Sequence, residues 1–135
     1  MKEKLLSINN LSVRYQADRG PVRAVSNVCF TIHKGEFFGL AGESGCGKST
    51  IAFAIMRLLK GAASVPQGEI NFAGRNLLTL DREGMRTFRW EKASMVLQSA
   101  MNNLNPVITI GSQLSDAIRA HRAISKAQAI ERAAE

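Results

Sequence analysis

The chain has 135 residues, of which 45% are hydrophobic, and it carries a formal net charge of +7. A chain of this length can bury one core but is too short for two ordinary domains, so we expect one domain or a piece of one. Its basic residues form no run interleaved with aromatics, which argues against a nucleic-acid partner, and no apolar stretch approaches the ~18 residues of a membrane span.

Alternating apolar residues predict a strand over residues 5–15 and a second strand over residues 28–32. The apolar run Phe37-Phe38-Gly39-Leu40-Ala41 predicts a third strand, buried on both faces. After a glycine-rich loop, apolar residues at helical spacing predict a helix over residues 51–59 that stops at Gly61.

The second half of the chain continues with short elements. Alternation between two glycines predicts a strand or hairpin edge over residues 68–74, and Asp81 can cap a helix through about residue 90. Residues 93–97 are an apolar run suited to an inner strand that ends at Gln98. Two helices are then predicted, at residues 109–123 and 125–135. This order of strands and helices indicates an α/β fold.

The glycine-rich loop satisfies the phosphate-loop pattern G-x-x-x-x-G-K-S/T. Its glycines allow backbone N–H groups to approach phosphate oxygens, and the following helix adds the positive end of its dipole. Lys48 can reach the β- and γ-phosphates, Ser49 can place its hydroxyl on Mg²⁺, and Thr50 can donate to an α-phosphate oxygen. The implied ligand is a nucleoside triphosphate with Mg²⁺. The expected binding residues of the loop are Gly42, Glu43, Ser44, Gly45, Cys46, Gly47, Lys48, Ser49 and Thr50.

Two of these loop residues have a plainer interpretation. Cys46 and Cys29, the two cysteines of the chain, form no metal-ligand spacing, so we interpret Cys46 as a small filler of the loop. Glu43 is interpreted as a surface contact, because a carboxylate is a poor neighbour for a γ-phosphate.

The position of the loop in the chain selects among phosphate-loop proteins. In kinases and GTPases the loop typically follows the first strand, whereas here a long stretch of strand pattern precedes it. This order resembles the ATP-binding cassette (ABC) family, in which an antiparallel subdomain comes first and supplies an aromatic that stacks on adenine. Tyr15, in "LSVRY", occupies the matching place; the alternative is an aromatic that covers the edge of the sheet. The resemblance implies a P-loop NTPase fold with an antiparallel β subdomain, a partial core sheet with the P-loop helix, and the start of a helical subdomain.

A second stretch, "MVLQSAMNNLNP", resembles the segment around the Q-loop glutamine of peptide and nickel importers in this family. "AVSNVCFTIHKGEFFGLAGESGCGKST" and "TIGSQLSDAIRAH" resemble the same subfamily. The resemblance implies that Gln98 positions water and ligates Mg²⁺ together with Ser49, and that Lys48 and Gln98 are catalytic. The alternative is that Gln98 only ends a strand. The subfamily usually has an acidic residue and a proline after this glutamine, where Ser99 and Ala100 stand here.

The resemblance also divides the chain into an ATP-binding core, residues 1–98, and a Q-loop with the start of a helical subdomain, residues 99–135. Residues 107–135 contain no LSGGQ-like run and no apolar strand ending in Asp-Glu, the family's signature and Walker B elements. We therefore expect the N-terminal part of a transport ATPase subunit. We also expect it to lack the strands that would flank the loop strand and to be unable to turn over ATP alone.

The function implied by the resemblance is an ATP-binding subunit that uses Mg-ATP to energise uptake of peptides or nickel. Its partners would be transmembrane permease subunits, a second ATP-binding subunit and, indirectly, a substrate-binding protein, at the cytoplasmic face of the plasma membrane. The first ten residues lack the apolar centre and cleavage site of a secretory signal, in agreement with this location. The alternative is a non-catalytic nucleotide-binding or interaction fragment. A GTPase or kinase is disfavoured, because the chain has no Asn-Lys-x-Asp guanine motif and no arginine-rich lid.

Overall fold

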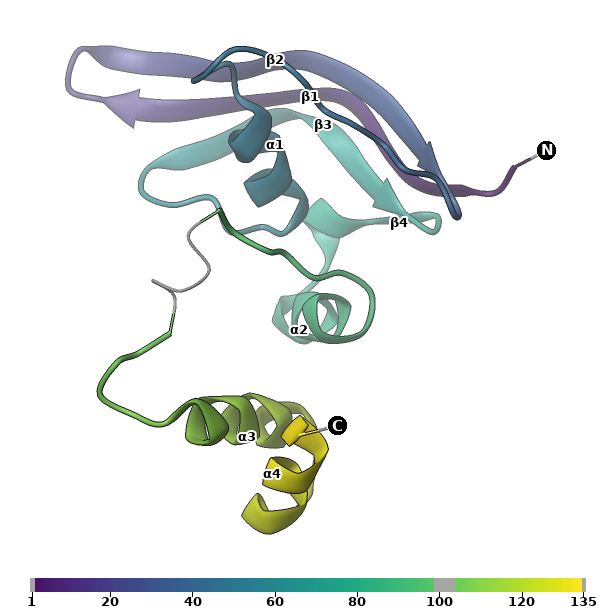
Figure 1. The fold of residues 1–135 in the computed structure, drawn as a ribbon. Coiled ribbons are helices and arrows are strands. Elements are labelled where there is room, and N and C mark those ends of the chain that lie inside the picture. The colour runs from purple at the N-terminus through teal and green to yellow at the C-terminus, as the bar shows by residue number, and fades with distance from the viewer. Residues whose placement is uncertain (1, 99–103, 135) are drawn as a thin grey trace. The chain divides into compact units, whose positions relative to one another are not determined.

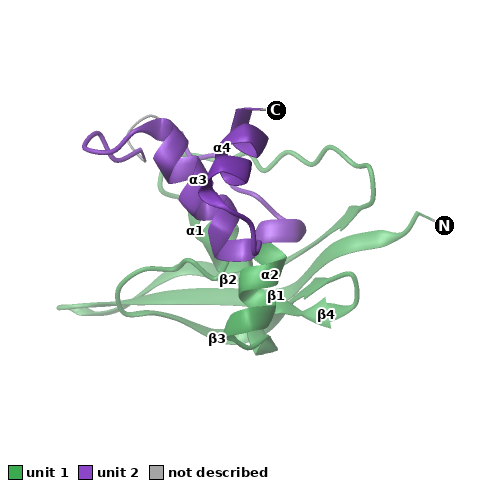
Figure 2. Cartoon of the chain, turned by 90° about the horizontal axis from the view of Figure 1, so that it is seen from below, with its two compact units in different colours: residues 1–89 green, residues 90–135 purple. Residues whose placement is uncertain are grey.

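The computed structural model describes residues 2–98 and 104–134 (Figure 1). Two compact units, residues 1–89 and 90–135, are described separately (Figure 2). The elements in chain order are β1 (Lys4–Ala17), β2 (Gly20–His33), α1 (Lys48–Ile55), β3 (Ala63–Phe72), β4 (Arg75–Asn76), the 3-10 helix η1 (Leu77–Thr79), α2 (Arg82–Glu91), α3 (Ile110–His121) and α4 (Lys126–Ala134).

The first unit is built on a four-stranded antiparallel sheet in the order β2-β1-β3-β4. The central strand β1 pairs with both β2 and β3, so that Tyr15 lies opposite Val22 on one side and Ala63 on the other. Left-handed backbone at Asn10 (φ 50°) and Asn27 (φ 49°) accompanies shifts in the β1–β2 register. Such bulges increase the twist of a sheet. The expected antiparallel subdomain is therefore confirmed.

The core of this unit lies between one face of the sheet and the helices α1 and α2. In Figure 1, α1 runs beneath the strands, and the aromatic ring of Phe88 on α2 meets that of Phe72 on β3 edge to face at 5.1 Å. The buried side chains are Leu6, Ile8, Leu11, Val13, Val25, Ile51, Ala54, Met56, Ile70, Leu77, Met85 and Phe88.

Local signals explain most helix boundaries. The Asp81 carboxylate accepts a hydrogen bond from the Gly84 N–H at 2.7 Å, which confirms the predicted cap of α2. The helix α1 ends at Ile55, four residues before the predicted Leu59. The reason is Arg57, whose left-handed conformation (φ 48°) stops the helix before Gly61.

Two strand predictions are wrong. Residues 37–41 and 93–97 are not strands, and Phe37 and Val96 have relative exposures of 104% and 88%. A strand requires hydrogen-bonding neighbours. Within residues 2–98 and 104–134, the one sheet is β2-β1-β3-β4, and neither segment pairs with it. Apolar composition was therefore not sufficient to make either segment a strand.

The second unit contains the two predicted helices. The Thr109 hydroxyl accepts from the Ser112 N–H and begins α3, and the Ser125 hydroxyl accepts from the Gln128 N–H and begins α4. At the start of this unit, the indole of Trp90 stacks on the ring of His121 with centroids 4.4 Å apart and planes 3° from parallel. Among the residues described, no helix is long and apolar enough to cross a membrane.

Candidate functional site

The glycine-rich loop is anchored at its end on strand β2. Gly47 caps α1 in a left-handed conformation (φ 97°), and a Cβ added there would lie 2.5 Å from the Ala24 carbonyl oxygen and 3.3 Å from a methyl carbon of Val25. No other residue type combines this conformation with such an approach to backbone. The start of α1 is thus fixed to the sheet through a position that only glycine can occupy.

The N-terminus of α1 is open toward the loop. No side chain caps it, and its first turn carries no acidic residue. The first N–H groups of any helix lack intrahelical partners, and the helix dipole makes this end positive. The backbone therefore offers donors and positive potential to an anion at this point.

The ammonium of Lys48 lies within the loop that precedes it. Its Nζ donates to the carbonyl oxygen of Gly42 at 2.8 Å and to that of Glu43 at 2.6 Å, and it lies 3.4 Å from the Cys46 sulfur. Neutral carbonyls are weaker acceptors for an ammonium than anionic oxygens. A phosphate in the loop could therefore take over donors that the loop's own carbonyls hold here.

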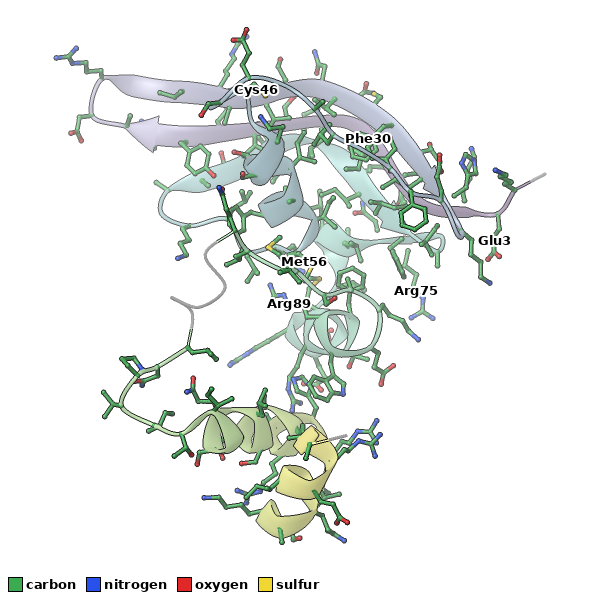
Figure 3. The ribbon with its side chains drawn as sticks, in the orientation of Figure 1. Glu3, Phe30, Cys46, Met56, Arg75 and Arg89 are labelled. Carbon is green, nitrogen blue, oxygen red and sulfur yellow. The ribbon has the colours of Figure 1, made fainter. Side chains whose placement is uncertain are left out.

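The other loop residues fall into two groups. Ser49 is exposed and Thr50 half-buried in the first turn of α1. The Glu43 side chain is exposed, in agreement with a surface contact, while its backbone carbonyl holds Lys48. Cys46 lies on the loop above the start of α1 (Figure 3), and a Cβ at Gly42 would come within 2.7 Å of its sulfur. This contact fits the interpretation of Cys46 as filler.

Tyr15 lies in the same unit as the loop. It is half-buried on β1 opposite Val22 of β2, and Val22 is two residues from Ala24, where Gly47 is anchored. Strand spacings put the backbone of Tyr15 about 8 Å from that anchor. The sheet thus brings Tyr15 and the anchor of the phosphate loop to the same region.

Gln98 is an exposed turn residue of the second unit rather than the end of a strand. Because the two units are described separately, its role beside the loop stays a prediction. Ser99 and Ala100 lie outside the described residues.

Two residues that hold the far end of α1 were missed by the sequence reasoning. Arg89 donates to the carbonyls of Met56 and Arg57 just after this helix, and Arg57 donates from there to the carbonyls of Leu77 and Leu80. One signal could have pointed to them: no glycine follows the last apolar position of the helix directly, so its terminal carbonyls need donors from elsewhere.

Comparison with known proteins decides the family. Residues 25–135 match the sequence profile of the family described as ABC transporter. The chain belongs to the ABC transporter family. Similar curated proteins of this family include a probable peptide ABC transporter ATP-binding protein of Sinorhizobium fredii, 41% identical over 97% of this chain. The dipeptide transport ATP-binding protein DppD of Bacillus subtilis is 43% identical over 92%, and the oligopeptide transport ATP-binding protein OppD of Salmonella typhimurium 41% identical over 94%. The chain spans 39%, 37% and 38% of the lengths of these three relatives.

Solved structures agree with the ABC assignment. The dimeric structure of the bacterial ABC transporter cassette MJ0796 matches 95% of this chain with a TM-score of 0.77 at 28% identity. A post-hydrolysis state of the same cassette, bound to ADP and Pi, matches 96% with a TM-score of 0.78 at 27% identity. This chain covers 53% and 54% of those two chains. The expected fold class, an ABC-type ATPase fold, is therefore confirmed.

Proposed function

We propose that this chain carries the phosphate-binding half of the ATP site in an ABC importer subunit that takes up peptides. The observation that supports this most is the Lys48 ammonium, which donates to the carbonyls of Gly42 and Glu43 beside the uncapped N-terminus of α1. An ammonium beside the free N–H groups of a helix N-terminus is a combination of donors that suits a phosphate group.

The residues present fit Mg-ATP, and each has a distinct part. Lys48 binds the β- and γ-phosphate oxygens, Thr50 donates to the α-phosphate, and Ser49 supplies a hydroxyl to Mg²⁺. Tyr15 stacks on the adenine ring, which orients the nucleotide. The family resemblance assigns Gln98 a neutral amide for Mg²⁺ and water. When bound, Mg-ATP supplies the γ-phosphoryl group whose hydrolysis drives transport.

The relatives and the fold support the wider assignment. Peptide, dipeptide and oligopeptide transport proteins are among those similar to nearly all of this chain, and peptides are therefore the proposed cargo rather than nickel. The cassette MJ0796 is dimeric, which supports a second ATP-binding subunit that completes the site. Transmembrane permease subunits and, indirectly, a substrate-binding protein are the further partners, at the cytoplasmic face of the membrane. Residues 1–98 form the ATP-binding core with its antiparallel β subdomain, and residues 99–135 form the Q-loop and the start of the helical subdomain.

Two measurements on the 135-residue polypeptide test this proposal: the dissociation constant for Mg-ATP and the rate of ATP hydrolysis. We expect binding of Mg-ATP without hydrolysis, because general base and signature residues are not among these residues. Hydrolysis of ATP that depends on Lys48 would contradict the proposal that this chain carries only half of the ATP site.

The adenine contact is tested by comparing ATP with inorganic triphosphate. Tyr15→Ala is expected to weaken ATP binding about two- to tenfold, the range of aromatic stacking energies, and to leave triphosphate binding unchanged. Tyr15→Phe keeps the ring and should bind like the wild type. An equal loss for both ligands in Tyr15→Ala would refute the stacking role.

A further inference from the structure

The C-terminal end of α1 has an unusual closure. The N–H groups of Arg57 and Leu58 donate back to the carbonyl oxygens of Ala54 and Phe53 at 3.0 and 2.8 Å, respectively. These are the two hydrogen bonds of a Schellman motif. Arg57 occupies the left-handed position (φ 48°) that glycine normally fills. A side chain there is strained, so its presence calls for a compensating contact.

The side chain of Arg57 supplies that contact. Its Nη1 donates to the carbonyl oxygen of Leu80 at 2.6 Å and to that of Leu77 at 3.3 Å. These carbonyls lie in and after η1. The strained residue that ends α1 therefore also ties this helix to the segment leading into α2.

A second arginine reaches the same helix end from α2. The Nε of Arg89 donates to the Met56 carbonyl at 2.9 Å, and its Nη2 donates to the Arg57 carbonyl at 2.8 Å. Figure 3 shows Arg89 beside Met56. Carbonyls at a helix C-terminus lack intrahelical partners, and a cation is favoured at this negative end of the dipole. The planar fork of a guanidinium satisfies both carbonyls at once, which an ammonium cannot do in the same geometry.

A small rotation of α1 about its C-terminal end would displace the phosphate loop at its other end by a large distance. The eight residues of α1 span about 12 Å, so a tilt of about 10° at the C-terminus moves the first turn by about 2 Å. A displacement of that size breaks hydrogen bonds to a ligand. Orientation of α1 at its far end is therefore a requirement for a productive loop.

We propose that Arg89 and Arg57 are positioning residues that hold α1, and with it the phosphate loop, in the orientation that binds phosphate. This inference rests on the proposed function for its effect on nucleotide, but the orientation of α1 can be measured without nucleotide. Both guanidinium groups act through backbone carbonyls, and neither is placed on the ligand.

The experiment compares four variants with the wild-type chain. Arg89→Ala removes the guanidinium that donates to both carbonyls, and Arg89→Lys restores a positive charge without the planar pair of donors. Arg57→Gly relieves the left-handed strain but removes the bonds to η1. Arg86→Ala is the matched control, because Arg86 lies one turn earlier on α2 and makes an exposed ion pair with Glu83 at 2.9 Å. The readouts are hydrogen–deuterium exchange of residues 48–58, the melting temperature, and the dissociation constant for Mg-ATP.

We expect Arg89→Ala to raise exchange in α1 at least tenfold and to weaken Mg-ATP binding about tenfold, with an intermediate effect for Arg89→Lys and none for Arg86→Ala. Arg57→Gly should keep the wild-type melting temperature and still bind Mg-ATP more weakly. A purely structural role would lower the melting temperature and the affinity together. If Arg89→Ala fails to fold, the unchanged melting temperature and lowered affinity of Arg57→Gly therefore still test the inference.

Exchange in α1 that is no faster in Arg89→Ala than in Arg86→Ala would overturn the inference. So would wild-type affinity in Arg57→Gly. If the wild-type chain itself fails to bind Mg-ATP, the proposed function is wrong, and the exchange data alone still decide whether the two arginines orient α1.

Discussion

Gly47 approaches Ala24 so closely that a methyl group at Gly47 would lie 2.5 Å from the Ala24 carbonyl oxygen. This contact joins the last residue of the phosphate loop to strand β2, which also pairs with the strand carrying Tyr15. The antiparallel sheet therefore anchors the loop and carries Tyr15, the two ends of the proposed nucleotide site.

Gly47→Ala tests this contact. The left-handed backbone costs about 1–2 kcal/mol for a side chain and the collision with Ala24 about 1–3 kcal/mol more, so we expect the free energy of unfolding to fall by about 2–5 kcal/mol. Gly45→Ala is the matched control, because Gly45 is also left-handed (φ 78°) but a Cβ there meets nothing within 4 Å. Equal losses in urea unfolding of the two variants would contradict the close approach.

The turn after β2 contains a carboxylate that stabilises the fold only when ionised. The backbone N–H of His33 donates to the Glu36 carboxylate at 2.6 Å, and this bond, helped by the His33 ring at 3.1 Å, lowers the pKa of Glu36 from its ordinary value of 4.5. A lowered pKa means that the folded state releases the proton more readily than the unfolded state. The contribution is therefore complete above pH 4.5 and is lost as the pH falls through the lower folded value.

Glu36→Gln makes this prediction measurable. At pH 7 the variant should melt at a lower temperature than the wild type, and the difference should shrink as the pH falls below 4.5. The control is Glu3→Gln, which removes only an exposed pair with Lys34 at 3.4 Å. A difference between Glu36→Gln and the wild type that stays constant from pH 7 to pH 3 would exclude ionised Glu36 as its source.

Phe37 is expected to make the isolated 135-residue chain associate. Its side chain is fully exposed, whereas its neighbour Phe38 stacks on Phe30 with ring centroids 4.8 Å apart. Exposed apolar side chains on an unpaired segment favour contacts between copies. Sedimentation equilibrium should show a lower average mass for Phe37→Ser than for the wild type at the same concentration. Phe38→Ser should instead lower the melting temperature, and an unchanged mass in Phe37→Ser would count against this account.

The sequence predicted the elements whose signals are local. The alternation around Tyr15 gave the central strand, Asp81 marked the start of α2, and Thr109 marked the start of α3. Each depends on side-chain period or on a cap within three residues. The pattern from Gly42 to Ser49 likewise placed the loop at the start of α1, although the buried strand predicted ahead of it is not formed.

The remaining features depend on residues far apart in the chain. Residues 37–41 and 93–97 have strand composition, but a strand forms only beside a partner, and the sheet offers them none in the part of the chain described. The early end of α1 depends on Arg57, whose strain is offset by carbonyls 20 and 23 residues away. Arg89 donates to backbone carbonyls that lie 33 and 32 residues earlier in the chain. The hydrophobic periodicity of the sequence therefore could not predict these contacts.

Whether the phosphate loop binds nucleotide is tested by equilibrium binding of Mg-ATP, measured by titration calorimetry on the wild-type chain and on Lys48→Ala. Lys34→Ala is the control for loss of one positive charge, because Lys34 pairs with Glu3 at the surface, away from the loop. We expect one Mg-ATP per chain, at least tenfold weaker binding in Lys48→Ala and wild-type affinity in Lys34→Ala. Equal affinity of the wild type and Lys48→Ala, or no binding by the wild type, would contradict this expectation.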